Sequence, residues 1–150
     1  MKKILAFTLS ALLFFMCFNT TVFASKANEN IIYFDDGSYL VTVITESPAR
    51  ATKTKTGTKD LNYYDSNDNL EWKVTLTGKF SYTGSSATCT SSSISYNIID
   101  TSWKIPTATA SKSGNKATGD IVAKHYLLGI PTKTVEQTIT LSCSASGTLS

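Results

Sequence analysis

The sequence predicts an all-β protein, an antiparallel β-sandwich of about seven to eight strands. Apolar and polar side chains alternate along most of the chain after Ile31, as in strands that bury one face. Turn-forming residues interrupt the alternation at strand-length intervals. No segment after residue 24 keeps a helical period over ten residues. Removing the first 24 of the 150 residues leaves 126, which is the size of one domain.

Four strands are predicted before residue 83. Their ranges are Ile31–Phe34, Tyr39–Thr45, Thr52–Tyr64 and 70–82. Clusters of Asp, Asn and Gly separate the first strand from the second and the third from the fourth, as turns require. The clearest strand is 70–82, where Trp72, Val74 and Phe80 share one face. Gly78 falls on that same face, which indicates a bend or a close contact with a neighbouring element.

Four more strands follow Gly84. Their ranges are Ala87–Ile99, Trp103–Ala110, Ala117–Leu127 and Thr134–Ser144. Gly114 and Gly129 mark the last two turns, and the segment Gly129-Ile130-Pro131 is expected to precede the final strand. Within 87–99 the apolar phase shifts after Cys89, which predicts a β-bulge at 91–93, three serines in a row.

An immunoglobulin-like architecture is the nearest analogy. Cys89, Trp103 and Cys143 have about the spacing of that fold's inter-sheet disulfide and packing tryptophan. However, Leu141 stands where the corner tyrosine would be, and too little sequence follows Cys143 for a last strand. The sandwich is therefore immunoglobulin-like in architecture at most, and a different topology is expected.

Residues 1–24 predict an export signal. Lys2 and Lys3 precede an apolar run from Ile4 to Phe18, and Val22-Phe23-Ala24 provides small residues for a signal peptidase. Cleavage between Ala24 and Ser25 gives a secreted, extracellular protein with no membrane contact once the signal is removed. The residues before Cys17 are bulky, so lipid attachment is not expected.

The chain after the signal carries twelve basic and eleven acidic residues, a net charge of +1. This balance argues against a nucleic-acid partner, and we expect a monomer. Cys89 and Cys143 both lie on the apolar phase of their strands. In an oxidising exterior two such cysteines typically form one disulfide, and two independent buried thiols are the alternative.

Groups suited to catalysis are few. His125 is the sequence's one histidine, which excludes a metal site that needs two imidazoles. It is in phase with Ile121 and Ala123, which predicts a hydrogen-bonded side chain beside the core. Asp35 and Asp36 are adjacent in a turn and cannot face a substrate from two sides, as glycoside hydrolysis requires. We predict neither an enzyme nor a cofactor.

Asp65, Asn67 and Asn69 place oxygen atoms at alternate positions, as a calcium loop does. Leu70 and Leu76 replace the glycine and the glutamate that such a loop needs, so a plain hairpin turn is favoured and no metal site is predicted.

Two polar surfaces are further candidates. Alternate threonines from 52 to 58 could bind ice or a crystalline polysaccharide, but lysines between them favour an exposed edge strand that resists aggregation. Four tyrosines could bind sugar or protein through rings with a polar tip, although about half are expected in the core. These tyrosines are Tyr63, Tyr64, Tyr96 and Tyr126.

Several segments together resemble a family of small secreted proteins of Gram-positive bacteria, a domain of unknown function. They are Thr75–Cys89, Thr54–Gly57, Ser102–Lys104, Ser111–Asn115 and Leu141–Gly147. The resemblance covers nearly all of the chain after the signal. It implies bacterial export and one compact domain, and it carries over no catalytic residue.

The function favoured by exclusion is a non-enzymatic extracellular binding module for a cell-surface glycan or protein. The alternative is a secreted effector, either an antimicrobial or toxin-like protein or an enzyme inhibitor.

Overall fold

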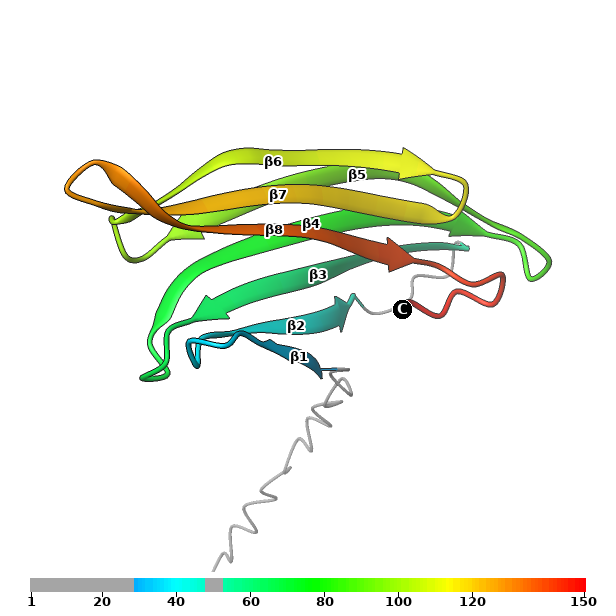
Figure 1. Ribbon diagram of the computed structural model, residues 1–150. Coiled ribbons are helices and arrows are strands. Elements are labelled where there is room, and N and C mark those ends of the chain that lie inside the picture. The colour runs from blue at the N-terminus through cyan, green and yellow to red at the C-terminus, as the bar shows by residue number, and fades with distance from the viewer. Residues whose placement is uncertain (1–28, 48–52) are drawn as a thin grey trace, which may run out of the picture.

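The computed structural model describes residues 29–47 and 53–150 as eight antiparallel strands in two sheets (Figure 1). The strands are β1 (Glu29–Tyr33), β2 (Tyr39–Glu46), β3 (Thr54–Tyr64), β4 (Leu70–Tyr82), β5 (Ala87–Ile98), β6 (Trp103–Ser113), β7 (Lys116–Leu127) and β8 (Ile130–Ser142). The predicted all-β sandwich is confirmed. The predicted signal and its cleavage site between Ala24 and Ser25 lie outside the described residues, as does Thr52.

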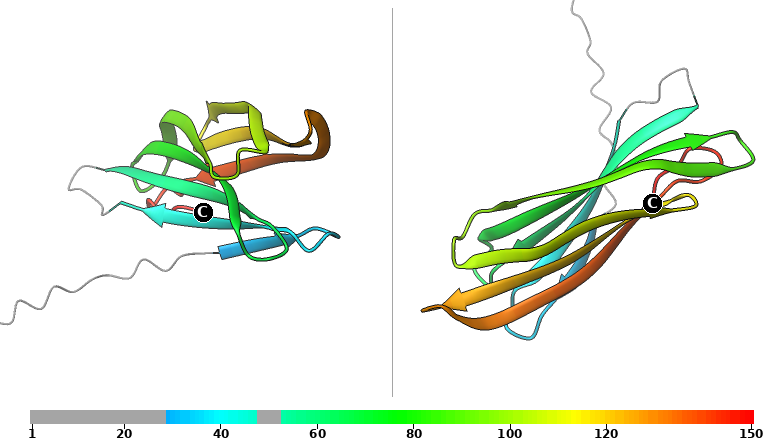
Figure 2. Two further views of the ribbon diagram at one scale, coloured as in Figure 1. Left: turned by 90° about the vertical axis from the view of Figure 1, so that its left-hand side faces the viewer. Right: turned by 90° about the horizontal axis from the view of Figure 1, so that it is seen from above.

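One sheet has the order β1-β2-β3-β4-β5 and the other the order β6-β7-β8. Figure 2 shows the smaller sheet lying over the larger one. The chain crosses from the larger sheet to the smaller one through the β5–β6 connection. Every strand pairs only with its neighbours in sequence, so both sheets are meanders. The Greek-key connections of an immunoglobulin domain are absent between the described strands. Within the same ranges, no helix is long and apolar enough to span a bilayer.

The core lies between the two sheets, where the alternation of apolar residues places it. Its largest fully buried side chains are Trp72, Phe80, Leu40, Leu61, Leu76, Leu141 and Val74. Gly78 is in close contact with a neighbour, as predicted. A Cβ there would lie 2.6 Å from the Phe80 ring and 3.2 Å from the Cβ of Ala117 on the opposite sheet. Glycine at this position lets the two sheets approach each other.

Three details of the sequence interpretation are wrong. The last strand begins at Ile130, not after Pro131, because β8 is an edge strand and tolerates a residue without an N–H. The bulge in β5 falls at Thr90, one residue before the predicted serines, since Lys79 pairs with Ser91 while Phe80 pairs with Cys89. The lysine–threonine strand β3 lies between β2 and β4 and is not an edge strand.

The strands alternate in direction, so their connections gather at two ends. We call one the groove end; its turns are 34–38, 65–69, 99–102 and 128–129. We call the other the cysteine end. It holds the turns 83–86 and 114–115 and the C-terminal segment 143–150. The C-terminal segment folds back on the sandwich, so that Leu149 is buried against Gly57, where a Cβ would lie 2.1 Å from its Cδ1.

The predicted disulfide is not formed in the structure, because both cysteines are free and buried. They nevertheless lie around one turn: the Cys89 amide donates to the Gly114 carbonyl (2.7 Å) and the Cys143 amide to the Asn115 carbonyl (3.0 Å). Burial raises the pKa of both thiols. Trp103 lies at the other end of the sandwich, so it does not pack on the cysteines as in the immunoglobulin fold.

Candidate functional site

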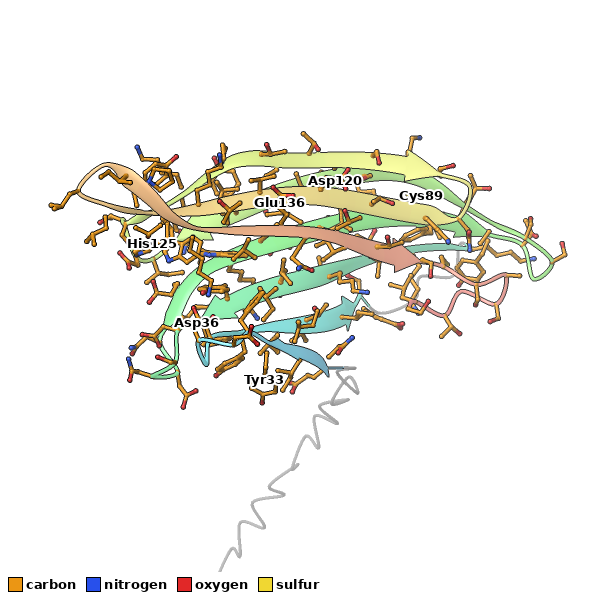
Figure 3. All side chains as sticks on the ribbon, in the orientation of Figure 1. Tyr33, Asp36, Cys89, Asp120, His125 and Glu136 are labelled. Atoms are coloured by element: carbon orange, nitrogen blue, oxygen red, sulfur yellow. The ribbon has the colours of Figure 1, made fainter. Side chains whose placement is uncertain are left out.

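A groove of about 800 Å³ opens at the groove end, between the two sheets. Its walls come from three turns of that end, 34–38, 65–69 and 99–102, and from residues of β3, β4, β6, β7 and β8. In Figure 3, Asp36 on the larger sheet and His125 on the smaller one lie at this end, and Cys89 lies at the other. The lining residues are Phe34, Asp35, Asp36, Ser38, Tyr63, Asp65, Ser66, Glu71, Asp100, Trp103, His125, Thr132 and Lys133.

Two β-bulges place side chains in this groove. In β4, Tyr63 pairs with Trp72 while Tyr64 pairs with Leu70, so Glu71 is an extra residue. In β8, His125 pairs with Lys133 while Tyr126 pairs with Pro131, so Thr132 is extra. A bulge reorients a side chain that strict alternation would place on the opposite face, and bulges are enriched beside binding sites. Glu71 and Thr132 both line the groove as a result.

Glu71 and Asp100 form a carboxyl pair in the groove. Burial raises the pKa of Glu71, and a hydrogen bond with Asp100 raises it further. Hydrogen bonds from Ser102, led by its backbone N–H, lower the pKa of Asp100. The indole N–H of Trp103 donates to Oε2 of Glu71 (3.1 Å). No lysine in the described ranges lies within ion-pair distance of either carboxyl group, so the pair faces the groove without a lysine partner.

Lys133 connects the two sheets across the groove. Its Nζ donates to Oδ2 of Asp36 (2.5 Å) and to Oγ of Ser38 (2.7 Å). It also lies over the rings of Phe34 and Tyr63, 4.8 Å and 5.2 Å from their centroids. The hydrogen bond from Lys133, followed by that from Ser38, lowers the pKa of Asp36 to about 2. Asp36 is therefore a turn residue, as predicted, and also part of a fixed ionic contact between the sheets.

His125 is partly buried and hydrogen-bonded beside the core, as its phase in β7 predicts. Its ring packs edge-on against Trp103, with the centroids 5.3 Å apart, and Nδ1 lies 2.7 Å from the hydroxyl of Thr132. The hydrogen-bond partner of the ring is thus a threonine hydroxyl. The sequence did not predict that this side chain would line a groove.

The four candidate tyrosines do not form one surface. Tyr63 is buried and stacks on Trp72, with centroids 5.2 Å apart, so it is a core residue. Tyr64 lies on the outside of the larger sheet, while Tyr96 is 52% exposed on β5. Tyr126 lies on β7 of the smaller sheet, beneath the ammonium group of Lys104 (4.9 Å).

A tyrosine ladder covers the outside of β1, β2 and β3. Tyr39 pairs in register with Tyr33 and Tyr64, at centroid distances of 5.6 Å and 5.0 Å. Tyr33 is labelled on the outer face of the larger sheet in Figure 3, away from the groove. The ladder is a second aromatic surface, of which the sequence indicated only Tyr64.

The candidate calcium loop is a hydrogen-bonded turn. Oδ1 of Asp65 accepts from the backbone N–H groups of Asn67 (2.9 Å) and Asn69 (2.8 Å), and Oδ2 accepts from the Asn69 side chain (2.9 Å). These hydrogen bonds, led by the Asn69 side chain, lower the pKa of Asp65. Within residues 29–47 and 53–150, no cluster of three or more His, Cys, Asp or Glu could hold a metal ion.

Sequence reasoning missed four residues of the groove: Glu71, Asp100, Trp103 as a hydrogen-bond donor, and Lys133. Alternation assigned Glu71 to the outer face, and only the bulge brings it inward. Asp100 and Lys133 are far apart in sequence from their partners.

No family model matches the chain, and no curated protein matches it. Among solved structures, it is similar to a hypothetical protein from Listeria monocytogenes. The two chains are 17% identical, the match covers 82% of this chain and 90% of the other, and the TM-score is 0.40.

Proposed function

We propose that this chain is a secreted, non-enzymatic binding module that takes a cell-surface glycan or protein segment in the groove. The observation that supports this proposal is the groove itself, with its carboxyl pair facing solvent and no lysine beside it. Concave sites with a few convergent polar groups are the usual form of ligand sites. Five carboxylates and one lysine line the groove, which favours a ligand with a positive charge, such as an amino sugar or a basic peptide segment.

The same geometry supports a binding function over hydrolysis. Asp100 is close enough to Glu71 to raise the pKa of Glu71, whereas the two carboxyl groups of a glycosidase stand about 5 Å or more apart, on two sides of the scissile bond. The described hydrogen-bond partner of His125 is the hydroxyl of Thr132, and no serine or cysteine takes that place. A panel of glycosidase, esterase, amidase and protease substrates tests this point. Turnover that disappears in a folded His125→Gln variant would show that the protein is an enzyme.

Binding of the purified protein to glycan arrays and whole cells tests the groove. Glu71→Gln and Asp100→Asn keep the shape of each side chain and remove its charge, and each should weaken binding about tenfold or more. Glu136→Gln is the matched control, because it also removes one negative charge but lies on an exposed position of β8 outside the groove.

Tyr33→Ser separates the groove from the tyrosine ladder. It removes an exposed ring of the ladder and should leave groove binding unchanged. Loss of binding in Tyr33→Ser, with full binding in Glu71→Gln and Asp100→Asn, would place the site on the ladder and contradict the proposal.

Export and oxidation also belong to the proposal. The two lysines and the apolar run at the start of the sequence support cleavage before Ser25. The intact mass of the secreted protein tests this cleavage, and a secreted form that retains Cys17 would contradict it. In an oxidising exterior we expect Cys89 and Cys143 to pair, because they lie around one turn. The family resemblance is consistent with both expectations and remains a proposal.

A further inference from the structure

The β7–β8 hairpin ends in an apolar tip that projects from the sandwich. Leu127, Leu128 and Ile130 are 61%, 95% and 66% exposed. In Figure 1 and in the view from above in Figure 2, this hairpin extends beyond the other turns of the groove end. Scattered apolar side chains are normal on a surface, but adjacent ones that protrude together mark an interaction site.

The backbone conformation of the turn at this tip is unfavourable for a leucine, the residue found at position 128. Leu128 and Gly129 both have positive φ angles, 52° and 82°. Two-residue hairpin loops with two positive φ angles prefer Asn-Gly, and a branched apolar residue in the first position is strained. The β6–β7 turn at the cysteine end uses the expected polar type of loop, Gly114-Asn115. Neither backbone preference nor solubility explains Leu128, so a contact outside the chain is the remaining reason for its exposure.

Positive charge lies directly behind the tip. Lys104 on β6 pairs in register with Lys124 on β7, so two like charges face each other. Neither has a carboxylate within ion-pair distance among the described residues, and like charges opposite one another destabilise a sheet. Tyr126, beneath Lys104, adds a ring with a polar tip of the kind enriched at membrane surfaces. This side of the hairpin is complementary to a negatively charged surface.

We propose that the tip inserts into the surface of an anionic lipid bilayer. A second copy of the chain fits less well, because stable protein interfaces use about 20–30 residues a side and the tip offers three large apolar side chains. A bilayer accepts a narrow protrusion. Lys124 lies three residues before Leu127, about 10 Å along the strand. Leu128 can therefore enter the acyl region while the lysines remain at the headgroups.

This proposal is independent of the groove and departs from the sequence-based expectation that the secreted chain makes no membrane contact. Flotation with vesicles tests it on the full mature protein. Vesicles of equal parts phosphatidylcholine and phosphatidylglycerol should carry the protein, and pure phosphatidylcholine vesicles should carry less. No binding to the anionic vesicles would overturn the proposal.

Leu128→Asn is the decisive variant, because asparagine suits the turn and removes the apolar side chain. Its partitioning onto anionic vesicles should fall about tenfold or more, while its melting temperature rises or holds. Ile31→Asn is the matched control: it replaces an exposed apolar residue on β1, away from the tip, and should bind vesicles as the parent does. Equal partitioning of Leu128→Asn and the parent would overturn the proposal.

Two further measurements identify the mode of contact. Lys104→Gln and Lys124→Gln should each weaken binding to anionic vesicles about fivefold, with little effect on neutral ones. In Ile130→Trp, the new indole should shift its fluorescence to shorter wavelength when vesicles are added, since Trp72 and Trp103 are already buried. Sedimentation showing a dimer that Leu128→Asn dissociates would instead assign the tip to self-association and overturn the bilayer proposal.

Discussion

The two ends of the sandwich differ in how many polar groups have hydrogen-bond or ionic partners and in how well their apolar side chains are buried. At the cysteine end, hydroxyls bond to one another and to the backbone, as in Thr83 with Ser86 and Ser142 with Ser150. The buried side chain of Leu149 packs the C-terminal segment against this end of the core. At the groove end, two carboxyl groups face each other without a lysine, and a leucine stands exposed in a strained turn. The closed end stabilises the fold, and the open end offers groups that an external ligand can satisfy.

Oxidation at the closed end should have the largest effect on stability. A Cys89–Cys143 disulfide would close a loop of about 54 residues and lower the entropy of the unfolded chain, which corresponds to about 4 kcal/mol. Replacing both cysteines by alanine should cost about 2–5 kcal/mol relative to the oxidised protein. Peptide mapping without reductant detects the bond, and denaturant unfolding measures its effect. Two alkylatable thiols in secreted protein would show that this end is held by packing alone.

Gly57→Ala should be the next largest change. The added Cβ would lie 2.1 Å from Leu149 and 3.1 Å from the Thr45 carbonyl oxygen, so the C-terminal segment must move. We expect a loss of about 1–3 kcal/mol in the free energy of unfolding. Hydrogen exchange of the Leu149 amide, which donates to Glu46 (3.1 Å), should become faster. An unchanged exchange rate would mean that the packing of Leu149 against Gly57 does not hold the C-terminal segment on the sandwich.

At the groove end, a single substitution should instead raise the free energy of unfolding. Leu128→Asn relieves a left-handed leucine and should stabilise the fold by about 1 kcal/mol. For a domain of this size the melting temperature should rise by about 4 °C, as calorimetry would show. A lower melting temperature would mean that Leu128 contributes to the fold, which would remove the contrast between the ends.

The smallest effect concerns Asp36. Its folded pKa of about 2 lies below the ordinary aspartate value of 3.8, so its contribution to stability is complete above pH 3.8 and is lost as the pH falls towards 2. The side chain is 57% exposed, so this contribution should stay below about 1 kcal/mol. Carboxyl NMR titration should place the pKa near 2, and Lys133→Met should move it towards 3.8. An unshifted value in the parent protein would mean that Lys133 does not hold the sheets together here.

The strands were readable from the sequence because alternation and turn residues are local signals. Strand 70–82 is found as predicted, and Gly78 makes the predicted contact. The division into sheets of five and three strands was not predictable, since it depends on which strands pair. For this reason the sequence predicts an edge position for the polar strand β3, whereas its lysines contact other elements. Nζ of Lys59, for example, donates to the Thr140 carbonyl oxygen.

The candidate site was harder to predict than the fold, for a physical reason. A bulge adds one residue and exchanges the two faces of a strand locally, so Glu71 and Thr132 point where alternation does not place them. Their partners come from other elements, Asp100 from the β5–β6 turn and His125 from β7. A site built by bulges and turns from distant segments leaves little trace in any one stretch of sequence.

The meander order of both sheets also bears on how the chain folds. Each strand pairs only with the strand before or after it in the sequence, so every described ladder joins consecutive strands. Only the docking of one sheet on the other requires distant segments to meet. Folding rates rise as contacts become more local. The chain should therefore refold faster than a Greek-key sandwich of equal length, because its hairpins can form one after another along the sequence.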